Sequence, residues 1–556
     1  MTNVPIRGLG STGVIADVGS YNLPMTAFTR AKNVRFSDGN VMAGPVFRSV
    51  SDNISYVPQF CYALASSTSY DTILVVDNTF DLYEFANGTG TQRFNSSLSA
   101  DNEAVVSATT LADVVYVNRN DTVPVARVPS ATNFTALANW PSNHKAGVLR
   151  SYGDFLLALN MTEGSNSFPN RVRFSDAVVA NSIPSTWDAS DTTNSAGFND
   201  LVQMVTPIVD GATLGTNFMI YSKDQVWMME FVGGTFIFNF RKVFDDCGVM
   251  SQDCIIEIEN KHYVFDRDDI YVTDGNSRQS ICDGRVRDYI FSGLDNSKSD
   301  VCFVMHNSKT EELYFCYNSQ DDLVGYGISG AGVDHCNRAA VYNYKEDLWS
   351  FQDLPNVVSG TEANINTTVT YNSTDIVYGG PNVIGIGGSY KDQDSPFTQH
   401  PIVLAKAYAG GQSTPLSNSK LFGVDLIDNG SISTAFDSGQ SKPPYLERSG
   451  LDLDELGISI DGYKTINKIL PQIKTENTDK VFTFTLDADD IVPSSSIFSG
   501  GTNIEFNSGT EYKVDTRLSG RYLSYRLSVL HSAANNGRKD FKFSGMDIDV
   551  LVTGKR

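Results

Sequence analysis

The clearest hydrophobic pattern in the chain lies between residues 218 and 275. Within it, Phe236, Phe238 and Phe240 recur at every second position, and this period of two predicts a β-strand rather than a helix. Gly233 and Gly234 separate this run from the apolar run that precedes it. Since a glycine pair permits the positive φ angles of a tight turn, the stretch predicts a β-hairpin.

A second hairpin pattern follows directly. Short apolar runs at residues 262–265 and 270–272 flank a charged turn at 266–269, and the unit ends on Asp274 and Gly275. Strands that run up and down through polar turns are typical of one blade of a β-propeller followed by part of the next.

The same unit recurs along the first two thirds of the chain. Successive units lie roughly 40 to 60 residues apart, which is the spacing of propeller blades. One sheet with two apolar faces cannot cover both, whereas sheets stacked around an axis cover one another. The sequence therefore predicts a β-propeller of about six blades within residues 55–355. The units begin at Thr72, Asp113, Asp154, Phe218, His262 and Glu312.

The remaining segments predict an all-β, multidomain chain, because 556 residues are too many for one core. Residues 1–54 form an extended segment that packs on another domain. Residues 356–400, rich in Gly, Asn and Thr, form a linker or insertion, and residues 401–556 regain strands and predict a β-sandwich-like platform domain. The one helix-like piece is at 284–294, where Val286, Ile290 and Phe291 share a face.

Charge narrows the range of partners. The chain carries 64 acidic and 42 basic residues, a formal net charge of −22. Such a surface repels nucleic-acid phosphates and anionic membranes, and no run of basic residues exceeds two. A groove that grips phosphates is therefore not expected.

Seven cysteines form an odd set without zinc-like spacing, and most sit beside strand-like apolar residues. They are predicted to be buried free thiols, which implies folding in a reducing cytoplasm. The start of the chain lacks the apolar core of a signal peptide, and no 18-residue apolar run predicts a membrane span. The cysteines are Cys61, Cys247, Cys254, Cys282, Cys302, Cys316 and Cys336.

Three carboxylate clusters are candidates for hydrolytic chemistry. Glycoside hydrolysis needs two carboxyl groups about 5 to 9 Å apart in a cleft. Each cluster falls on a predicted turn, where carboxylates are usually solvated, and the last lacks the closing Glu of a calcium loop. All three are predicted to be structural. They are Asp266, Asp268 and Asp269; Asp452, Asp454 and Glu455; and Asp487, Asp489 and Asp490.

Nucleophilic and cofactor chemistry has less support. The histidines are scattered, and no nucleophile elbow or phosphate-binding loop accompanies them. Trp227 and Trp349 could stack on sugars, but we expect them to fill space between blades. No catalytic, cofactor-binding or metal-ligating residue is predicted. The histidines are His144, His262, His306, His335, His400 and His531.

Residues 15–47 resemble the opening of the tail nozzle proteins, or tail tubular protein B, of short-tailed (podovirus-type) bacteriophages. That opening carries an Asn-Val-Arg-Phe-x-Asp-Gly motif, which residues 33–39 match. The Gly248-x-x-Ser251 step before the Asp274-Gly275 stop, and the closing strands of the chain, are similar to the same family. Residues 356–400 have no counterpart in this resemblance.

The resemblance implies a non-enzymatic virion protein, made in the host cytoplasm, that forms a homo-hexameric ring below the portal and head-to-tail adaptor. Propellers would lie at its periphery and a DNA channel at its axis. Tail fibres or spikes are further expected partners, and genomic DNA would pass through without sequence-specific binding. We expect an acidic channel wall, along which DNA slides, with the basic tail Lys555-Arg556 away from it.

A competing class is a carbohydrate-binding or glycan-depolymerising propeller at a cell surface. That function would require a pocket on the propeller axis with two close carboxylates and an exposed aromatic residue. A secreted host propeller is a third possibility, which the odd cysteine count disfavours.

Overall fold

The computed structural model describes residues 2–45, 47–66, 70–234, 236–320, 334–365, 399–407, 418–424, 444–458, 461–475, 481–491, 501–529 and 541–555. It is nearly all β, with 56% strand and 4% helix, so the predicted all-β, multidomain class is confirmed. The predicted helix is also confirmed, because α1 (Arg287–Gly293) follows Val286 and buries Ile290. Short 3-10 segments occupy Ser20–Asn22, Asn296–Val301, which is kinked at Lys298, and Asp454–Leu456.

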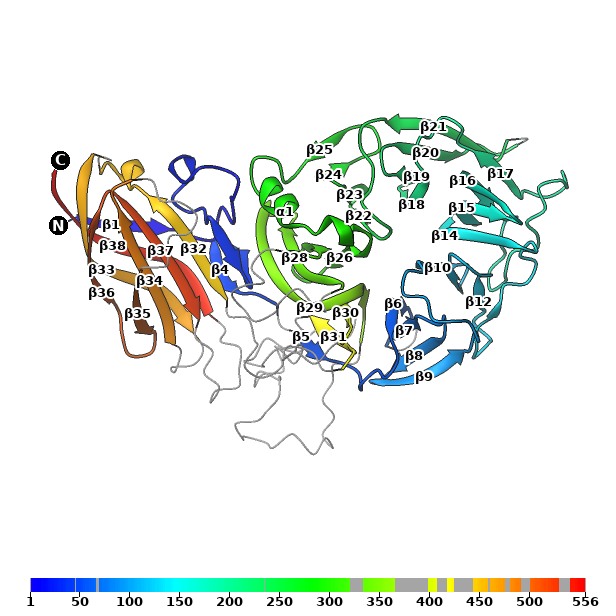
Figure 1. Cartoon of the computed structure of the whole chain (residues 1–556), viewed down its shortest axis with the longest axis horizontal. Coiled ribbons are helices and arrows are strands. Elements are labelled where there is room, and N and C mark those ends of the chain that lie inside the picture. The colour runs from blue at the N-terminus through cyan, green and yellow to red at the C-terminus, as the bar shows by residue number, and fades with distance from the viewer. Residues whose placement is uncertain are drawn as a thin grey trace.

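Six antiparallel sheets, numbered here in chain order, follow one another around a common centre (Figure 1). Sheets 1 to 3 are β6 (Pro58–Leu64), β7 (Thr72–Asp77), β8 (Leu82–Ala86) and β9 (Thr89–Phe94); β10 (Val106–Leu111), β11 (Val114–Arg119), β12 (Val125–Arg127) and β13 (Thr135–Ala136); and β14 (His144–Tyr152), β15 (Phe155–Glu163), β16 (Asn166–Phe174) and β17 (Gly197–Asp200).

Sheets 4 and 5 have the same four-stranded order, and sheet 6 is wider. They are β18 (Ile208–Leu214), β19 (Asn217–Ser222), β20 (Val226–Phe231) and β21 (Phe238–Phe244); β22 (Ile255–Ile258), β23 (Lys261–Phe265), β24 (Ile270–Thr273) and β25 (Arg278–Ser280); and β26 (Phe303–Asn307), β27 (Glu312–Tyr317), β28 (Cys336–Asn343), β29 (Leu348–Ala363), β30 (His400–Ala405), β31 (Lys420–Val424) and β5 (Phe47–Ser49). Each of the six predicted units falls in a separate sheet.

The first strands of successive sheets lie against one another from β6 to β26, and β29 and β30 of sheet 6 contact β6 of sheet 1. The second strand of a sheet is apolar on both faces. In β7, Ile73 and Val75 pack in a core with sheet 6, whereas Leu74 and Val76 pack in a core with sheet 2. Successive residues therefore serve two different neighbours, as the period of two requires.

The predicted hairpin around Gly233 is present. Strands β20 and β21 pair from Phe231 opposite Phe238, and Gly233 and Gly234 have φ angles of 68° and 78°. Phe236 differs from the prediction, since β21 begins at Phe238 and the Phe236 side chain is 79% exposed in the loop.

The predicted break after Pro355 does not divide the sheets. Strand β29 continues through Pro355 to Ala363, and β30 and β31 join sheet 6 rather than the C-terminal domain. Pro355 falls where the β28–β29 register shifts, between Asp353 and Val357, so no ladder bond needs its missing N–H. Residues 366–398 of the predicted linker lie outside the described residues.

Two further sheets share a core at the other end of the molecule (Figure 1). The N-terminal segment supplies β1 to β4 to these sheets, and Met546, Ile548 and Val550 of β38 are buried in their core. Sheet 7 has β3 (Val34–Ser37), β4 (Asn40–Ala43), β38 (Phe541–Lys555), β33 (Gly462–Thr475) and β36 (Val514–Gly520), with β1 (Thr2–Arg7) also on β38; sheet 8 has β2 (Arg30–Lys32), β32 (Tyr445–Leu451), β37 (Tyr522–Val529), β34 (Val481–Asp489) and β35 (Thr502–Asn507).

The motif at residues 33–39 connects these two sheets to sheet 6. Asp38 and Gly39, with φ angles of 53° and 69°, form the two-residue turn between β3 and β4, a type that requires positive φ at both positions. On β3, Arg35 donates to Glu312 through Nε–Oε1 (2.5 Å) and Nη2–Oε2 (2.8 Å). Asn33 Nδ2 donates to Asp353 Oδ2 at 3.0 Å. The motif therefore fixes β3 against β27 and β29.

Replacing Glu312 with Gln should lower the free energy of unfolding by about 3 kcal/mol, because it removes the negative charge from a largely buried ion pair with Arg35. Chemical denaturation of the variant measures this. Glu230→Gln is the matched control, since Glu230 pairs with Arg241 at the surface and the expected loss is below about 1 kcal/mol. Equal losses in the two variants would mean that the Arg35–Glu312 pair does not hold the sheets together.

Candidate functional site

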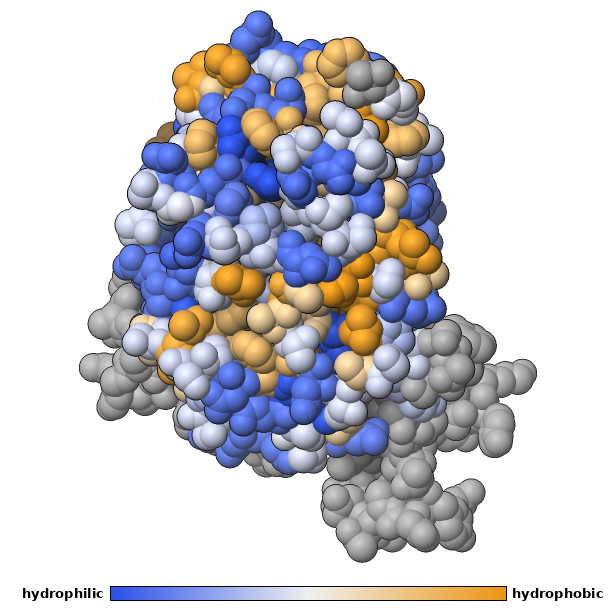
Figure 2. Space-filling model, turned by 90° about the vertical axis from the view of Figure 1, so that its right-hand side faces the viewer, coloured by the Kyte–Doolittle hydropathy of each residue, from blue (hydrophilic) through white to orange (hydrophobic). Residues whose placement is uncertain are grey.

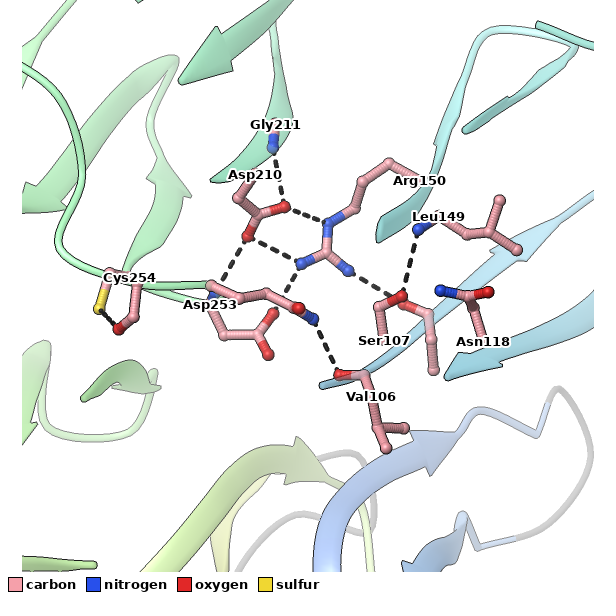
Figure 3. Close-up of polar contacts among 12 residues, drawn as sticks. Val106, Ser107, Asn118, Leu149, Arg150, Asp210, Gly211, Asp253 and Cys254 are labelled. Atoms are coloured by element: carbon pink, nitrogen blue, oxygen red, sulfur yellow. Dashed lines mark hydrogen bonds and ion pairs between the residues drawn. The ribbon is translucent and has the colours of Figure 1, made fainter. Parts of the chain in front are cut away.

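A buried ionic group lies where β14, β18 and the segment just before β22 meet (Figure 3). Arg150 donates from Nε to Asp210 Oδ1 and from Nη2 to Asp210 Oδ2, both at 2.8 Å. Nη2 also donates to Asp253 Oδ1 at 2.7 Å. One guanidinium thus joins sheets 3, 4 and 5 through two carboxylates, and we call these three residues the Arg150 cluster.

Two irregularities of the backbone aim the carboxylates. The β18–β19 register shifts between Ile208 and Asp210, a bulge that re-aims the side chain. Asp253 has a φ angle of 60°, in the left-handed region that aspartate tolerates better than most residues. In this conformation its N–H donates to Asp210 Oδ2 at 2.9 Å, while Gly211 N–H donates to Oδ1 at 2.7 Å.

Hydrogen bonds extend the cluster to sheet 2. Arg150 Nη1 donates to the Ala108 carbonyl at 3.4 Å, and Gln252 Nε2 donates to the Val106 carbonyl at 2.9 Å. Next to them, Leu149 N–H donates to Ser107 Oγ at 3.1 Å. Four consecutive sheets are therefore connected through the ends of their first strands.

The two carboxylates differ in exposure. Asp210 is 3% exposed, whereas 39% of the Asp253 side chain remains exposed. Burial raises the pKa of Asp253 to about 6, although Arg150 opposes this and Asp210 adds to it. Water at the exposed side stabilises the ionised form and limits how far the pKa rises. Burial lowers the pKa of Arg150, but the two carboxylates outweigh it and the net pKa is raised.

The cluster brings two carboxyl groups together, which is one requirement of glycoside hydrolysis. A general base, however, needs an oxygen that is free to take a proton. Both oxygens of Asp210 already accept two hydrogen bonds each. The geometry therefore fastens sheets to one another and leaves Asp253 as the group that faces solvent.

The first predicted carboxylate cluster makes hydrogen bonds to neighbouring backbone and side-chain groups and is not fully solvated. Asp266 is buried and accepts hydrogen bonds from Gly248 N–H (2.9 Å) and Arg267 N–H (2.7 Å). Burial raises the pKa of Asp266. Asp269 Oδ1 accepts from Ser280 Oγ at 2.6 Å, whereas Asp268 is exposed. The prediction that the Asp266 carboxylate is solvated was wrong, because the turn folds back on Gly248 and buries it.

The other two carboxylate clusters come together at one end of β33. The Tyr463 hydroxyl donates to Asp490, and the negative charges of Asp452 and Asp454 act on the neighbouring Lys464. Burial, together with Asp487 and Asp490, raises the pKa of Asp489. Over the residues that the structure describes, no three His, Cys, Asp or Glu side chains are arranged to hold a metal ion.

Four of the described histidines, His144, His262, His306 and His335, lie beside carbonyls, carboxylates or tyrosines. His262 is buried between the Tyr221 hydroxyl and the Thr213 carbonyl, both at 2.8 Å, and burial lowers its pKa. His306 and His335 lie beside Glu362 and Asp334. His144 lies 3.6 Å from Glu163, His400 is buried in β30, and His531 is outside the described residues.

All seven cysteines are buried and free, which confirms the prediction. Four of them gather between sheets 5 and 6, where Cys254 Sγ donates to the Cys302 carbonyl at 3.3 Å. Burial raises the pKa of Cys254 to about 12, so the thiol stays protonated. Trp227 and Trp349 are buried as well, in agreement with a packing role.

Sequence reasoning missed the Arg150 cluster. Its only signal is a single charge within an apolar strand, Arg150 in VLRSY and Asp210 in IVDGA. Arg150 is 60 residues from Asp210 and 103 from Asp253, so spacing along the chain does not suggest that they meet.

Comparison with models of protein families and with curated proteins finds no match to this sequence. In the described part of the chain, no helix has the length and apolar character needed to span a membrane. Function is therefore inferred from the residues and their geometry.

The raised pKa of Asp253 predicts a pH dependence of stability. Because the folded state holds the Asp253 proton more tightly than the unfolded state, this contribution is complete below pH 4 and is lost as the pH rises through about 6. Asp253→Asn removes it, so wild type should lose stability relative to the variant over that window, by less than about 1 kcal/mol after screening by water.

Urea denaturation of both proteins between pH 4.5 and 7.5 measures the difference. A difference that does not change with pH would mean that Arg150 keeps Asp253 ionised throughout. Asp268→Asn is the control, since Asp268 lies at the surface.

Proposed function

We propose that this chain is a non-enzymatic structural subunit of a short phage tail. Six copies form a ring-shaped nozzle that continues the DNA channel below the portal and adaptor and conducts the genome during ejection. In each copy, sheets 1 to 6 form a closed six-bladed β-propeller, and sheets 7 and 8 form the platform that holds the ring together.

The closed propeller is supported by the packing of sheet 1. The apolar side chains of its second strand are shared between sheet 2 on one face and sheet 6 on the other, and β29 and β30 contact β6. Sheets that cover one another around an axis leave no apolar face exposed at an end.

The observation that carries the structural, non-enzymatic role is the Arg150 cluster. Its charges are placed at the convergence of the first strands, where a ligand of a propeller would bind. There Arg150 and Asp210 form two hydrogen bonds with each other and so connect sheets 3 and 4. A centre of the six sheets whose polar groups join neighbouring sheets is suited to a rigid structural subunit.

The motif at residues 33–39 supports the tail assignment independently. It belongs to one of the segments that resemble the nozzle proteins, and in this chain it fixes the platform sheets against sheet 6. A subunit that transmits contacts from head connector to fibres or spikes needs such a rigid joint. Seven buried free thiols are compatible with synthesis in the host cytoplasm before incorporation into the virion.

A carbohydrate-binding or depolymerising propeller is the second candidate, and Asp253 favours it. This carboxylate lies close to a second one and is partly exposed, with a raised pKa. Against this candidate, Asp210 is occupied by four donors, which makes it a poor base.

Light scattering and negative-stain imaging of the purified chain, alone and with the head-to-tail connector, test the proposal. We expect six-fold rings with a central channel when the connector is present. A chain that stays monomeric and clears capsular polysaccharide would favour the second candidate, and loss of clearing in Asp253→Asn would establish it. Rings without clearing would support the nozzle.

A further inference from the structure

Charge is unevenly distributed along the chain. Residues 1–50 contain five basic and two acidic residues, and residues 501–556 contain nine basic and six acidic ones. Each terminal segment thus carries +3, and since the whole chain carries −22, the residues between them carry −28. In the structure, β1 and β4 from the first segment both pair with β38 from the second. The basic ends of an acidic chain are therefore combined in sheet 7.

The outer surface of sheet 7 carries three basic side chains at one end. Lys474 of β33 lies directly opposite Lys542 of β38, and Arg7 of β1 pairs with Gly545 on the other side of β38. All three are exposed and alternate with more buried neighbours, so they point away from the core. Tyr512, 71% exposed, lies at the same end. We call these four residues the basic face.

Within the described ranges, Arg7, Lys474 and Lys542 form no ion pair, although many other basic residues of the chain do. Like charges directly opposite each other in a sheet are destabilising. Two facing lysines at the surface of an otherwise acidic protein thus indicate a place where an anionic partner would offset the repulsion between the two positive charges.

The opposite end of β33 has the complementary properties. Ten residues separate Lys464 from Lys474, which is about 33 Å along a strand. Around Lys464 lie the two carboxylate clusters, and no ion pair involves Asp454, Glu455 or Asp490 over the described residues. Ile491, 78% exposed, and Leu456 are apolar side chains in the same group. We call Asp452, Asp454, Glu455, Leu456, Asp490 and Ile491 the acidic face.

We propose that the acidic face of one copy docks on the basic face of the next copy, and that this head-to-tail contact closes the ring. The inference rests on the proposed function, since it names the contact that holds the nozzle together. A second copy is the occupant that the charges favour, because the same unit carries both complementary faces. A two-fold contact through either face alone would place like charges together, whereas a head-to-tail contact repeats around a ring.

Each face also carries an exposed apolar or aromatic side chain that can be desolvated. Charge pairs supply orientation and association rate, and buried anchors supply much of the affinity. Tyr512 on the basic face and Ile491 on the acidic face are placed for this role.

A charge-swap experiment with the full chain tests the contact. The first variant, Lys474→Glu/Lys542→Glu, makes the basic face acidic, and the second, Asp454→Lys/Glu455→Lys, makes the acidic face basic. Each alone should associate at least tenfold more weakly than wild type by light scattering with the connector, because like faces meet. An equal mixture should recover rings, since the two reversed faces complement each other and the two unchanged faces do as well.

The mixture has a second readout. Only alternating copies satisfy every contact, so the recovered rings should contain the two variants in equal numbers by native mass spectrometry.

Lys145→Glu/Lys261→Glu is the matched control for Lys474→Glu/Lys542→Glu, because it makes the same change in net charge at exposed positions of β14 and β23. It should assemble as wild type does, and all variants should melt within a few degrees of wild type.

The outcomes separate the two proposals. If wild type forms no ring with the connector, the proposed function fails. If wild type forms rings and both charge-reversal variants do too, the docking proposal fails and the nozzle stands. Loss of rings in the single variants without recovery in the mixture also overturns it. Rings that persist in Lys474→Glu/Lys542→Glu but bind duplex DNA less tightly would assign the basic face to DNA instead.

Discussion

The second strand of each small sheet is hydrophobic on both faces, and this constraint governs the fold. In β15, Leu156 and Ala158 pack in the core shared with sheet 2, while Leu157 and Leu159 pack in the core shared with sheet 4. In β19, Phe218 and Ile220 face sheet 3, and Met219 and Tyr221 join the next core. A lone four-stranded sheet would leave one of these rows in water, at a cost of about 25 cal/mol per Å² of apolar surface. Each sheet therefore requires a neighbour on both sides, and only repetition supplies them.

Hydrophobic burial brings sheets together but does not fix their angle, since it has no preferred direction. Hydrogen bonds and ion pairs at the junctions between sheets fix this angle. The Arg150 cluster ties sheets 3, 4 and 5, and His262 on β23 ties sheet 5 to β19 and β18 of sheet 4 through Tyr221 and Thr213. A buried charge group of this kind contributes little net stability compared with apolar residues of the same shape. The cluster instead specifies how the sheets are arranged. Any arrangement that separated Arg150 from its two carboxylates would leave unpaired buried charges and is therefore disfavoured.

Sequence periodicity predicts the strands well and their partners poorly. The continuous apolar runs in residues 72–77 and 218–222 follow directly from burial on both faces, so these strands could be predicted. The Gly-, Asn- and Thr-rich composition after Pro355 suggested a boundary, but β29 continues through Pro355, which lies at a register shift. The Arg150 cluster could not be predicted, because residues 60 and 103 positions apart meet only after three sheets have formed. The two carboxylate clusters at 452–455 and 487–490 meet for a similar reason, through the intervening strand β33.

The two ends of the chain complete the structure together. Sheet 7 joins β1, β3 and β4 to β38, and sheet 6 joins β5 to β31. These pairings connect residues hundreds of positions apart, so closing them costs loop entropy, and we expect them to form late in folding. Sheets 1 to 5 have mostly local pairings and can form before them. The surface of sheet 7, which carries Arg7 and Lys542 from opposite ends of the chain, therefore exists only after β38 has been made. In the proposed ring, this order would keep the proposed docking surface of sheet 7 absent until the rest of the molecule has folded.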